Sequence, residues 1–464
     1  MEQKENKGNF TGHLGFVLAA AGSAVGIGNL WRFPYLAAKD GGGLFLIIYL
    51  ILVVTFGFTL LTSDIAIGRR TKQSAILAYE TMSKKWKFLG VLTFLVPVII
   101  MTYYAVIGGW VTKYAVMYFI GQGDALSSDT YFTDFISSPT SPVIYGVIFM
   151  LVTGFIIYRG VQNGIEKVSK FIMPILFVMV IGIAIFALTL RHEDGDTVRT
   201  GLDGLKFYLS IHAEGMTVTR FLRILLDAMS QLFFSLSVSM GIMITYGSYV
   251  SKSVNLNTAV NQIEICDTAV AFLAGVMIIP SIFVFQGVDG MSAGPSLLFV
   301  SLPKVFAAMG SIGNVIGAAF FVMVIFATLT SCISVLEAIT ANCMVIFHKD
   351  RKKTTLVLTV IYAVATAVIA LGYSIFYAEI PLPNGTVGQL LDLMDYISNS
   401  FMMPFIAFLS CILIGWVVGP NYVTDEVEYG GVVMRRKKMY RVMVKYISPV
   451  LMAILFITST GLIH

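Results

Sequence analysis

Residues Gly22-Ser-Ala-Val-Gly-Ile-Gly-Asn29 decide how this chain folds. They lie in the middle of an apolar run long enough to cross a bilayer, yet they carry three glycines and two polar side chains. Each glycine costs a helix about 1 kcal/mol relative to alanine, so a continuous helix through this stretch is weak. Because bare N–H and C=O groups cost several kcal/mol in lipid, the predicted interruption must line a cavity.

The composition around this stretch is that of a membrane protein. Of 464 residues, 57% are hydrophobic and 12% are charged, whereas soluble domains carry about 25% charged residues. A single water-soluble core stops growing near about 250 to 300 residues, so the bilayer must act as the solvent. We predict an all-α integral membrane protein that forms one domain over residues 1–464. The chain has no GxxxxGK[ST], HExxH or GxSxG signature with partners, so an enzyme is not expected.

Apolar runs of about 20 residues predict transmembrane helices. Eleven spans are expected, at residues 13–37, 43–67, 88–120, 142–159, 168–190, 223–250, 258–286, 314–347, 355–377, 387–417 and 440–462. Most Lys and Arg residues fall on one set of alternate connections, which places the N-terminus in the cytoplasm and the C-terminus outside the plasma membrane. These basic connections suit anionic lipid rather than nucleic acid. Two outer connections, 191–222 and 287–313, are long enough for short helices or lids.

A second interrupted span begins at residue 223. Ser235-Leu-Ser-Val-Ser-Met-Gly241 brings hydroxyl groups and a glycine into it. If residues 13–190 form a five-helix repeat and residues 223–417 an inverted copy, both interruptions fall in the first helix of a repeat. Paired interruptions of this kind are typical of the binding site of a secondary transporter. For either segment alone, the alternative is that small residues merely permit close helix packing.

Polar side chains in other apolar spans add to the predicted site. Asp267 interrupts the seventh span, Thr330 and Ser331 lie in the eighth, and Tyr104 lies in the third. Hydroxyl, carboxylate and free carbonyl oxygens are hard ligands that suit a cation such as sodium. Free N–H groups at a helix N-terminus suit an anion, which implies an amphoteric substrate. For Thr330 and Ser331 alone, hydrogen bonds to carbonyls one turn earlier are the simpler interpretation.

Four stretches resemble the neurotransmitter:sodium symporter family. They are Gly22-Ser-Ala-Val-Gly-Ile-Gly-Asn-Leu-Trp-Arg-Phe-Pro-Tyr35, Gln231-Leu-Phe-Phe-Ser-Leu-Ser237, Ile244-Thr-Tyr-Gly-Ser-Tyr249 and Ala327-Thr-Leu-Thr-Ser331. The resemblance runs from about residue 7 to residue 417 and is strongest to bacterial eleven-helix amino-acid transporters. It implies a leucine-transporter-like fold with helices 1 and 6 broken, and sodium-coupled amino-acid import by alternating access.

The resemblance also implies two sodium sites and a substrate site. The first sodium would bind Gly22, Val25, Ala327, Thr330 and Ser331. The second sodium would bind Ala24, Asn29, Ser235 and Asp267 together with the substrate carboxylate. The substrate site would comprise Ser23, Ala24, Ile27, Gly28, Ile100, Tyr104, Phe234, Ser235, Ser237, Met240, Ser331 and Val335.

Departures from the family pattern refine the expected substrate and ions. Gly26 stands where amine carriers have Asp, which favours an amino acid that brings its own carboxylate. Met240 makes a deformable pocket wall, which favours large neutral substrates, aromatic ones included. Asp267 and Ala271 stand where chloride-dependent members have Asn and Ser, so we expect chloride-independent transport. An amine transporter and a non-transporting sensor are the alternatives.

The resemblance assigns gates on both sides of the membrane. Arg32 and Asp395 resemble the pair that closes the outer face, with Phe234 as a lid below them. On the cytoplasmic side, Lys7 and Tyr249 occupy gate positions, and Phe10 stands where the family usually has Trp. The usual acidic partner in the eighth span is replaced by Val345, with Asp350 five residues further on. The inner gate is therefore expected to be weaker or to use another partner.

Overall fold

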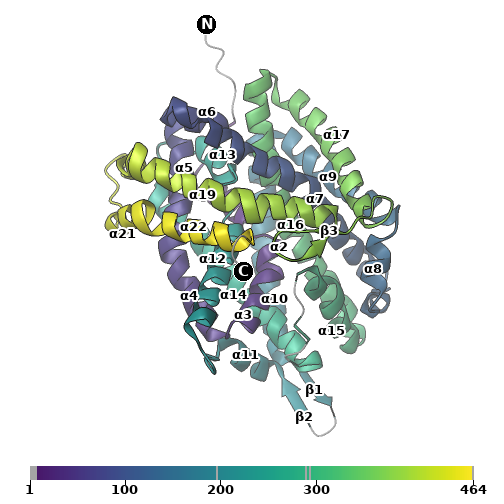
Figure 1. Ribbon diagram of the computed structural model, residues 1–464. Coiled ribbons are helices and arrows are strands. Elements are labelled where there is room, and N and C mark those ends of the chain that lie inside the picture. Colours follow the sequence, from purple (N-terminus) through teal and green to yellow (C-terminus); the bar gives the residue numbers. More distant parts are fainter. Residues whose placement is uncertain (1–7, 195–196, 288–289, 292–293, 462–464) are drawn as a thin grey trace.

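Helices form at all the predicted spans in the computed structural model, which describes residues 8–194, 197–287, 290–291 and 294–461 (Figure 1). The membrane segments are α1–α3 (His13–Ala24, Ile27–Leu30, Arg32–Lys39), α4–α5 (Gly43–Leu52, Phe58–Thr71), α7 (Lys87–Phe119), α9 (Ser141–Tyr158), α10 (Lys167–Thr189), α12–α13 (Val218–Ser235, Ile242–Ser248), α14 (Leu256–Gln286), α16 (Ser311–Phe347), α17 (Arg351–Ala370), α18–α19 (Leu390–Asp395, Met403–Ile412) and α21–α22 (Lys437–Val442, Ser448–Ser459). Wider π-helical turns extend or join several of them: η1 (Val53–Gly57), η4 (Val161–Glu166), η8 (Tyr396–Met402), η9 (Leu413–Val417) and η10 (Met443–Ile447).

In the described part of the chain, nine helices are long and apolar enough to cross a membrane, and the bent α1–α3 segment makes a tenth. The α12–α13 segment falls outside that count because it is interrupted and carries Arg220, Arg223 and Asp227 in its first half. The number eleven therefore stays a prediction. Predicted boundaries shift by a few residues, as where the ninth span begins at Arg351 rather than at residue 355.

Short elements fill the connections between the membrane segments. The short helices are α6 (Ala75–Met82), η2 (Lys84–Trp86), η3 (Gly123–Ser127), α8 (Tyr131–Ile136), α11 (Gly201–Leu209), η6 (Leu297–Ser301), α15 (Leu302–Ala308), η7 (Leu371–Tyr373) and α20 (Asn421–Val427). The all-α class is confirmed, and two small antiparallel hairpins lie in the connections: β1–β2 (Arg191–Asp194, Thr197–Thr200) and β3–β4 (Ile380–Pro381, Val387–Gly388). The β1–β2 hairpin and α6 lie at opposite ends of the molecule (Figure 1).

Both predicted interruptions are present. The first membrane segment bends by 59° between α1 and α2, where Val25 and Gly26 adopt extended backbone angles. The second break separates α12 from α13, and Ser237, Ser239 and Gly241 have positive φ angles of 52°, 61° and 74° there. Left-handed backbone is unfavourable for serine, so neighbouring groups must hold this stretch in place.

Glycines let α5, the second half of the second membrane segment, touch α13, the second half of the sixth. A Cβ added to Gly68 of α5 would lie 1.9 Å from the carbonyl oxygen of Ile244 in α13. A Cβ added to Gly247 of α13 would lie 2.4 Å from the carbonyl oxygen of Ile65 in α5. The two helices are therefore in backbone contact, and a side chain larger than that of glycine at either position would push them apart.

Candidate functional site

The two helix breaks meet α7 and α16 around a buried central cavity. Its lining is Ser23, Ala24, Gly26, Gly28, Asn29, Ile100, Tyr104, Phe234, Ser235, Ser237, Met240, Ser331 and Val335. The structure thus brings together every predicted substrate residue except Ile27, which is buried beside the cavity. The cavity volume is about 30 Å³, room for a water molecule or two. An amino acid needs the walls to move apart.

Hydrogen bonds join the two breaks directly. The Ser237 hydroxyl donates to the carbonyl oxygen of Ser23 at 3.0 Å, and Gln231 Nε2 donates to the carbonyl oxygen of Gly28 at 3.2 Å. The backbone N–H of Ser239 donates to Asp64 Oδ2 of α5 at 2.9 Å. These bonds explain how the left-handed serines are held. Asp64, missed by the sequence analysis, carries a detectable signal, since it is an acidic residue in an apolar span.

The predicted first sodium site gathers oxygen atoms from α1 and α16. Ser331 Oγ lies 3.1 Å from the carbonyl oxygen of Ser23, 3.4 Å from that of Gly22 and 3.5 Å from that of Val25. Thr330 Oγ1 lies 3.1 Å from the Ala327 carbonyl oxygen. Thr330 also bonds one turn back, to the carbonyl of Phe326 at 2.9 Å. Converging carbonyl and hydroxyl oxygens suit a hard monovalent cation.

The predicted second sodium site is organised around Asp267 of α14. Asn29 Nδ2 donates to Asp267 Oδ1 at 2.8 Å and the Ser235 hydroxyl donates to the same oxygen at 2.7 Å. The Asp267 side chain is fully buried, and its Oδ2 atom has no hydrogen-bond partner among the described residues. A buried carboxylate oxygen without a partner is costly, so the residues present fit a bound cation. Contacts for Ala24 in this role stay a prediction.

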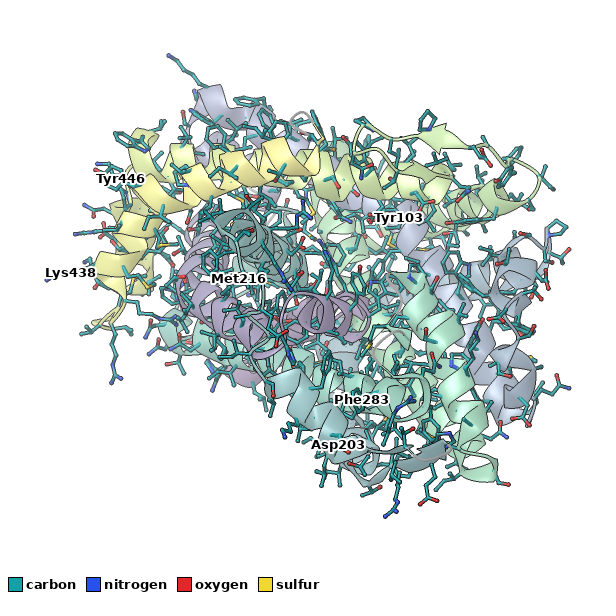
Figure 2. All side chains as sticks on the ribbon, turned by 60° about the horizontal axis from the view of Figure 1, so that its bottom comes forward. Tyr103, Asp203, Met216, Phe283, Lys438 and Tyr446 are labelled. Atoms are coloured by element: carbon teal, nitrogen blue, oxygen red, sulfur yellow. The ribbon has the colours of Figure 1, made fainter. Side chains whose placement is uncertain are left out.

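The predicted outer-gate residues face one cavity without touching. In the described part of the chain, Arg32 and Asp395 form no ion pair and both line a cavity of about 310 Å³. Arg32 Nη2 donates to Ser230 Oγ at 2.8 Å. Asp395 Oδ1 accepts from Asn399 Nδ2 at 2.6 Å and from the Tyr103 hydroxyl at 3.0 Å. Tyr103 is labelled in Figure 2. Closure of the pair requires this cavity to collapse.

On the cytoplasmic side, the predicted gate residue Tyr249 meets a carboxylate other than the usual one, in line with the expectation of another partner. Tyr249 donates to Glu337 Oε1 at 2.6 Å, and Arg351 binds both Glu337 oxygens at 2.6 and 2.7 Å. Asp350 instead accepts from the Lys353 N–H at the start of α17. Asp350 therefore serves as the N-terminal cap of α17, and the carboxylate that meets Tyr249 is Glu337. Glu337, a fully buried carboxylate in the eighth span, was overlooked although it is an intramembrane charge.

The remaining gate residues are placed as follows. Lys7 lies outside the described residues. Phe10 is buried against Tyr246 and Tyr249, with ring centroids 5.5 and 6.1 Å apart. Phe234 lines both the central and the outer cavity, which suits the lid role expected for it.

Fold and site together define a membrane transporter whose first and sixth segments are broken around a polar centre. The family model described as the sodium:neurotransmitter symporter family matches residues 7–129 and 132–463. The chain belongs to this family, a family of sodium-dependent symporters rather than enzymes, and the resemblance stated from the motifs is confirmed.

Individual relatives agree with this assignment. The chain is 31% identical to the uncharacterized sodium-dependent transporter YhdH of Bacillus subtilis, over 97% of both chains. It is 26% identical to the sodium- and chloride-dependent GABA transporter 2 of Rattus norvegicus, over 92% of this chain and 77% of that one. The crystal structure of MhsT in complex with L-phenylalanine has a TM-score of 0.84 and 33% identity, covering 97% of this chain and 99% of MhsT.

Proposed function

We propose that this symporter imports neutral amino acids, mainly hydrophobic and aromatic ones, together with two sodium ions and without chloride. The observation that carries the proposal is the central cavity, where oxygen atoms for two cations flank a pocket that has no acidic side chain at Gly26. The wall residues Ile100, Phe234, Met240 and Val335 are apolar. The L-phenylalanine bound to MhsT, a structure with the same fold, supports this substrate class.

The geometry suggests how sodium and substrate binding are coupled. A cation beside Ser331 ties α1 to α16, because its ligands come from both helices. A cation beside Asp267 ties α14 to both breaks, and the substrate carboxylate completes its shell next to Tyr104 and the N–H groups of Ile27 and Gly28. In this mechanism the first, second, sixth and seventh segments rock as one bundle against the others. The outer cavity closes as Arg32 reaches Asp395.

Uptake into proteoliposomes tests this function. An inward sodium gradient should concentrate radiolabelled phenylalanine above its outside level, and an inward potassium gradient should not. Because two sodium ions accompany a neutral zwitterion, a negative interior should accelerate uptake, each charge gaining about 2.3 kcal/mol per 100 mV. Sodium-dependent binding without accumulation would instead support a sensor. Preference for the decarboxylated analogue would support an amine carrier.

Chloride independence follows from the fixed charge of Asp267. The neighbouring Ala271 offers no hydroxyl for chloride, and both residues are fully buried. Uptake should stay unchanged when gluconate replaces chloride. The Asp267→Asn, Ala271→Ser double variant should lose that independence. If gluconate reduced uptake by the wild type as much as uptake by the double variant, this part of the proposal would be contradicted.

Topology and internal symmetry complete the proposal. The matching breaks support residues 13–190 and 223–417 as inverted five-helix repeats, with 440–462 as an added eleventh helix. The N-terminus would lie in the cytoplasm and the C-terminus outside the plasma membrane. Impermeant thiol reagents applied to intact cells should label a cysteine placed in the β1–β2 hairpin and spare one placed in α6.

A further inference from the structure

The connection between the tenth and eleventh segments contains a short helix between two glycine sites. Helix α20 is preceded by Gly419, with φ of 84°, and followed by Gly430 and Gly431, with φ of 77° and 85°. A Cβ added to any of the three would meet no atom within 4 Å. Packing therefore does not require glycine at these positions, whereas the left-handed backbone does. Both ends of α20 are points where the chain can turn.

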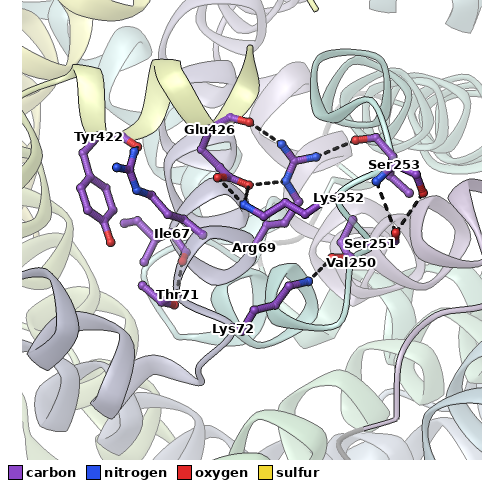
Figure 3. A network of polar contacts seen from close by, with 12 residues as sticks. Ile67, Arg69, Thr71, Lys72, Val250, Ser251, Lys252, Ser253, Tyr422 and Glu426 are labelled. Atoms are coloured by element: carbon purple, nitrogen blue, oxygen red, sulfur yellow. Dashed lines mark hydrogen bonds and ion pairs between the residues drawn. The ribbon is translucent and has the colours of Figure 1, made fainter. Parts of the chain in front are cut away.

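Glu426 anchors α20 to other parts of the protein (Figure 3). Arg69, at the end of α5, places Nε 2.6 Å from Glu426 Oε1 and donates from Nη1 to the Val254 carbonyl at 2.6 Å. Lys252, in the connection between α13 and α14, contacts both Glu426 carboxylate oxygens at 2.6 Å. The Arg69 and Glu426 side chains are only 1% and 5% exposed. One buried carboxylate thus links α20 to the second segment and to the connection after the sixth.

The surrounding charges make Glu426 hard to replace. Lys72 lies close by and donates to the Val250 carbonyl. Burial, and then the nearby charges of Lys252 and Arg69, lower the pKa of Lys72. Removing this carboxylate would break the ion pair that Arg69 forms in the described part of the chain, which is the costly way to break a buried pair.

Attachments on the far side of Gly430 and Gly431 are of two kinds. The Lys437–Glu428 pair, at 2.6 Å, bridges the turn, but both side chains are about 30% exposed, and such surface pairs contribute little. Arg436 donates to the carbonyl of Val54 at 2.9 Å and to Glu264 Oε2 at 3.1 Å, on the second and seventh segments. The more buried contacts of this connection therefore go to the second and seventh segments and to the connection after the sixth, whereas α22 packs on α19 of the tenth segment.

We propose that Glu426 is a positioning residue that fixes α20 to the rocking bundle, so that α20 travels with α5 and α13 while the chain turns at Gly419. The inference rests on the proposed alternating access, because that mechanism moves segments 1, 2, 6 and 7 against the rest. Through Gly68 and Gly247, α5 packs backbone to backbone on α13, and α20 is attached to α5 through Arg69. The cytoplasmic boundary between moving and fixed parts then falls between η9 and α20.

Spin-label distances in nanodiscs, with and without sodium, test this. Labels at exposed positions Asp425 of α20, Thr258 at the start of α14 and Leu356 of α17 report the connection, the bundle and the fixed part. The distance between the labels at 425 (connection) and 258 (bundle) should stay constant. The distances from each of these two labels to the label at 356 (fixed part) should change together. A change in 258–356 while 425–356 stays constant would overturn this inference alone. A constant 258–356 distance would overturn the rocking mechanism and this inference with it.

A matched pair of variants adds a functional measurement. Glu426→Gln should broaden the 425–258 distance distribution and lower the maximal uptake rate at least tenfold, while phenylalanine binding changes less than threefold. Glu428→Gln, in the same connection, should leave both within twofold. A purely structural role would reduce the amount of folded, binding-competent protein without changing the distance in the surviving fraction, and that result would count against the proposal. Should Glu426→Gln not fold, the wild-type distances alone decide.

Discussion

Gly26 offers the sharpest test of the substrate assignment. A Cβ added there would lie 3.0 Å from Ser331 Oγ and 3.2 Å from the Tyr104 hydroxyl. An aspartate at position 26 would therefore place its carboxylate beside the Tyr104 hydroxyl, next to the expected position of the substrate carboxylate. We predict that Gly26→Asp abolishes amino-acid binding and lets an amine of the same shape bind instead.

The expected magnitude follows from the spacing. Two carboxylates about 4 Å apart repel by about 4 kcal/mol at an effective dielectric constant of about 20. Since each 1.4 kcal/mol is a factor of ten, phenylalanine affinity should fall about 1,000-fold. The same carboxylate would attract the ammonium group of phenethylamine, which has no carboxylate for the new side chain to repel.

Equilibrium binding of labelled phenylalanine and phenethylamine in saturating sodium measures the effect. Gly26→Ala reports the steric cost of a Cβ, and Gly26→Asn adds the bulk of the side chain without its charge. Most of the loss of phenylalanine affinity should appear between the Asn variant and the Asp variant. If Asp and Asn weaken phenylalanine binding equally, charge repulsion is not the cause and the carboxylate position is misassigned.

Three further outcomes follow. Ser331→Ala removes a hydroxyl that faces three carbonyl oxygens at the end of α1. The apparent sodium affinity, measured as sodium-dependent phenylalanine binding, should fall about tenfold. An unchanged affinity would place sodium elsewhere. Glu337→Gln breaks the buried ion pair with Arg351, at a cost of about 3 to 5 kcal/mol. As the inner side opens, thiol labelling of a cysteine placed at Met344, which lines the cavity beside Tyr249 and Arg351, should accelerate more than 100-fold. A change of only twofold would refute a gate role. Burial, and then the charge of Asp227, raise the pKa of Asp40 to about 7. Between about pH 4 and 7 the folded protein therefore keeps a proton on Asp40 that the unfolded chain has released. The free energy of unfolding of the protein should fall as pH rises through this range. Asp40→Asn should flatten that slope in thermal unfolding, and an unaltered slope would assign it to another group.

Much of the fold could be predicted from local sequence. A membrane helix satisfies its own hydrogen bonds, so an apolar run identifies it without knowledge of its neighbours. The break at Val25 and Gly26 was predictable for the same reason, because glycine and polar residues at bilayer depth oppose a continuous helix. The small strands of the β1–β2 hairpin were not predicted, since short polar segments outside the membrane carry no comparable constraint.

Apolar runs, polar interruptions and motifs along the chain are enough to predict the membrane class, the two helix breaks and the family. The partners of the buried charges depend on the packed fold. Asp64 holds the left-handed Ser239, Glu337 joins Tyr249, and Glu426 binds Arg69 from 357 residues away in the chain. Burial of a single charge can be seen in a sequence, because the surrounding residues are apolar. Which opposite charge compensates it depends on how distant helices pack.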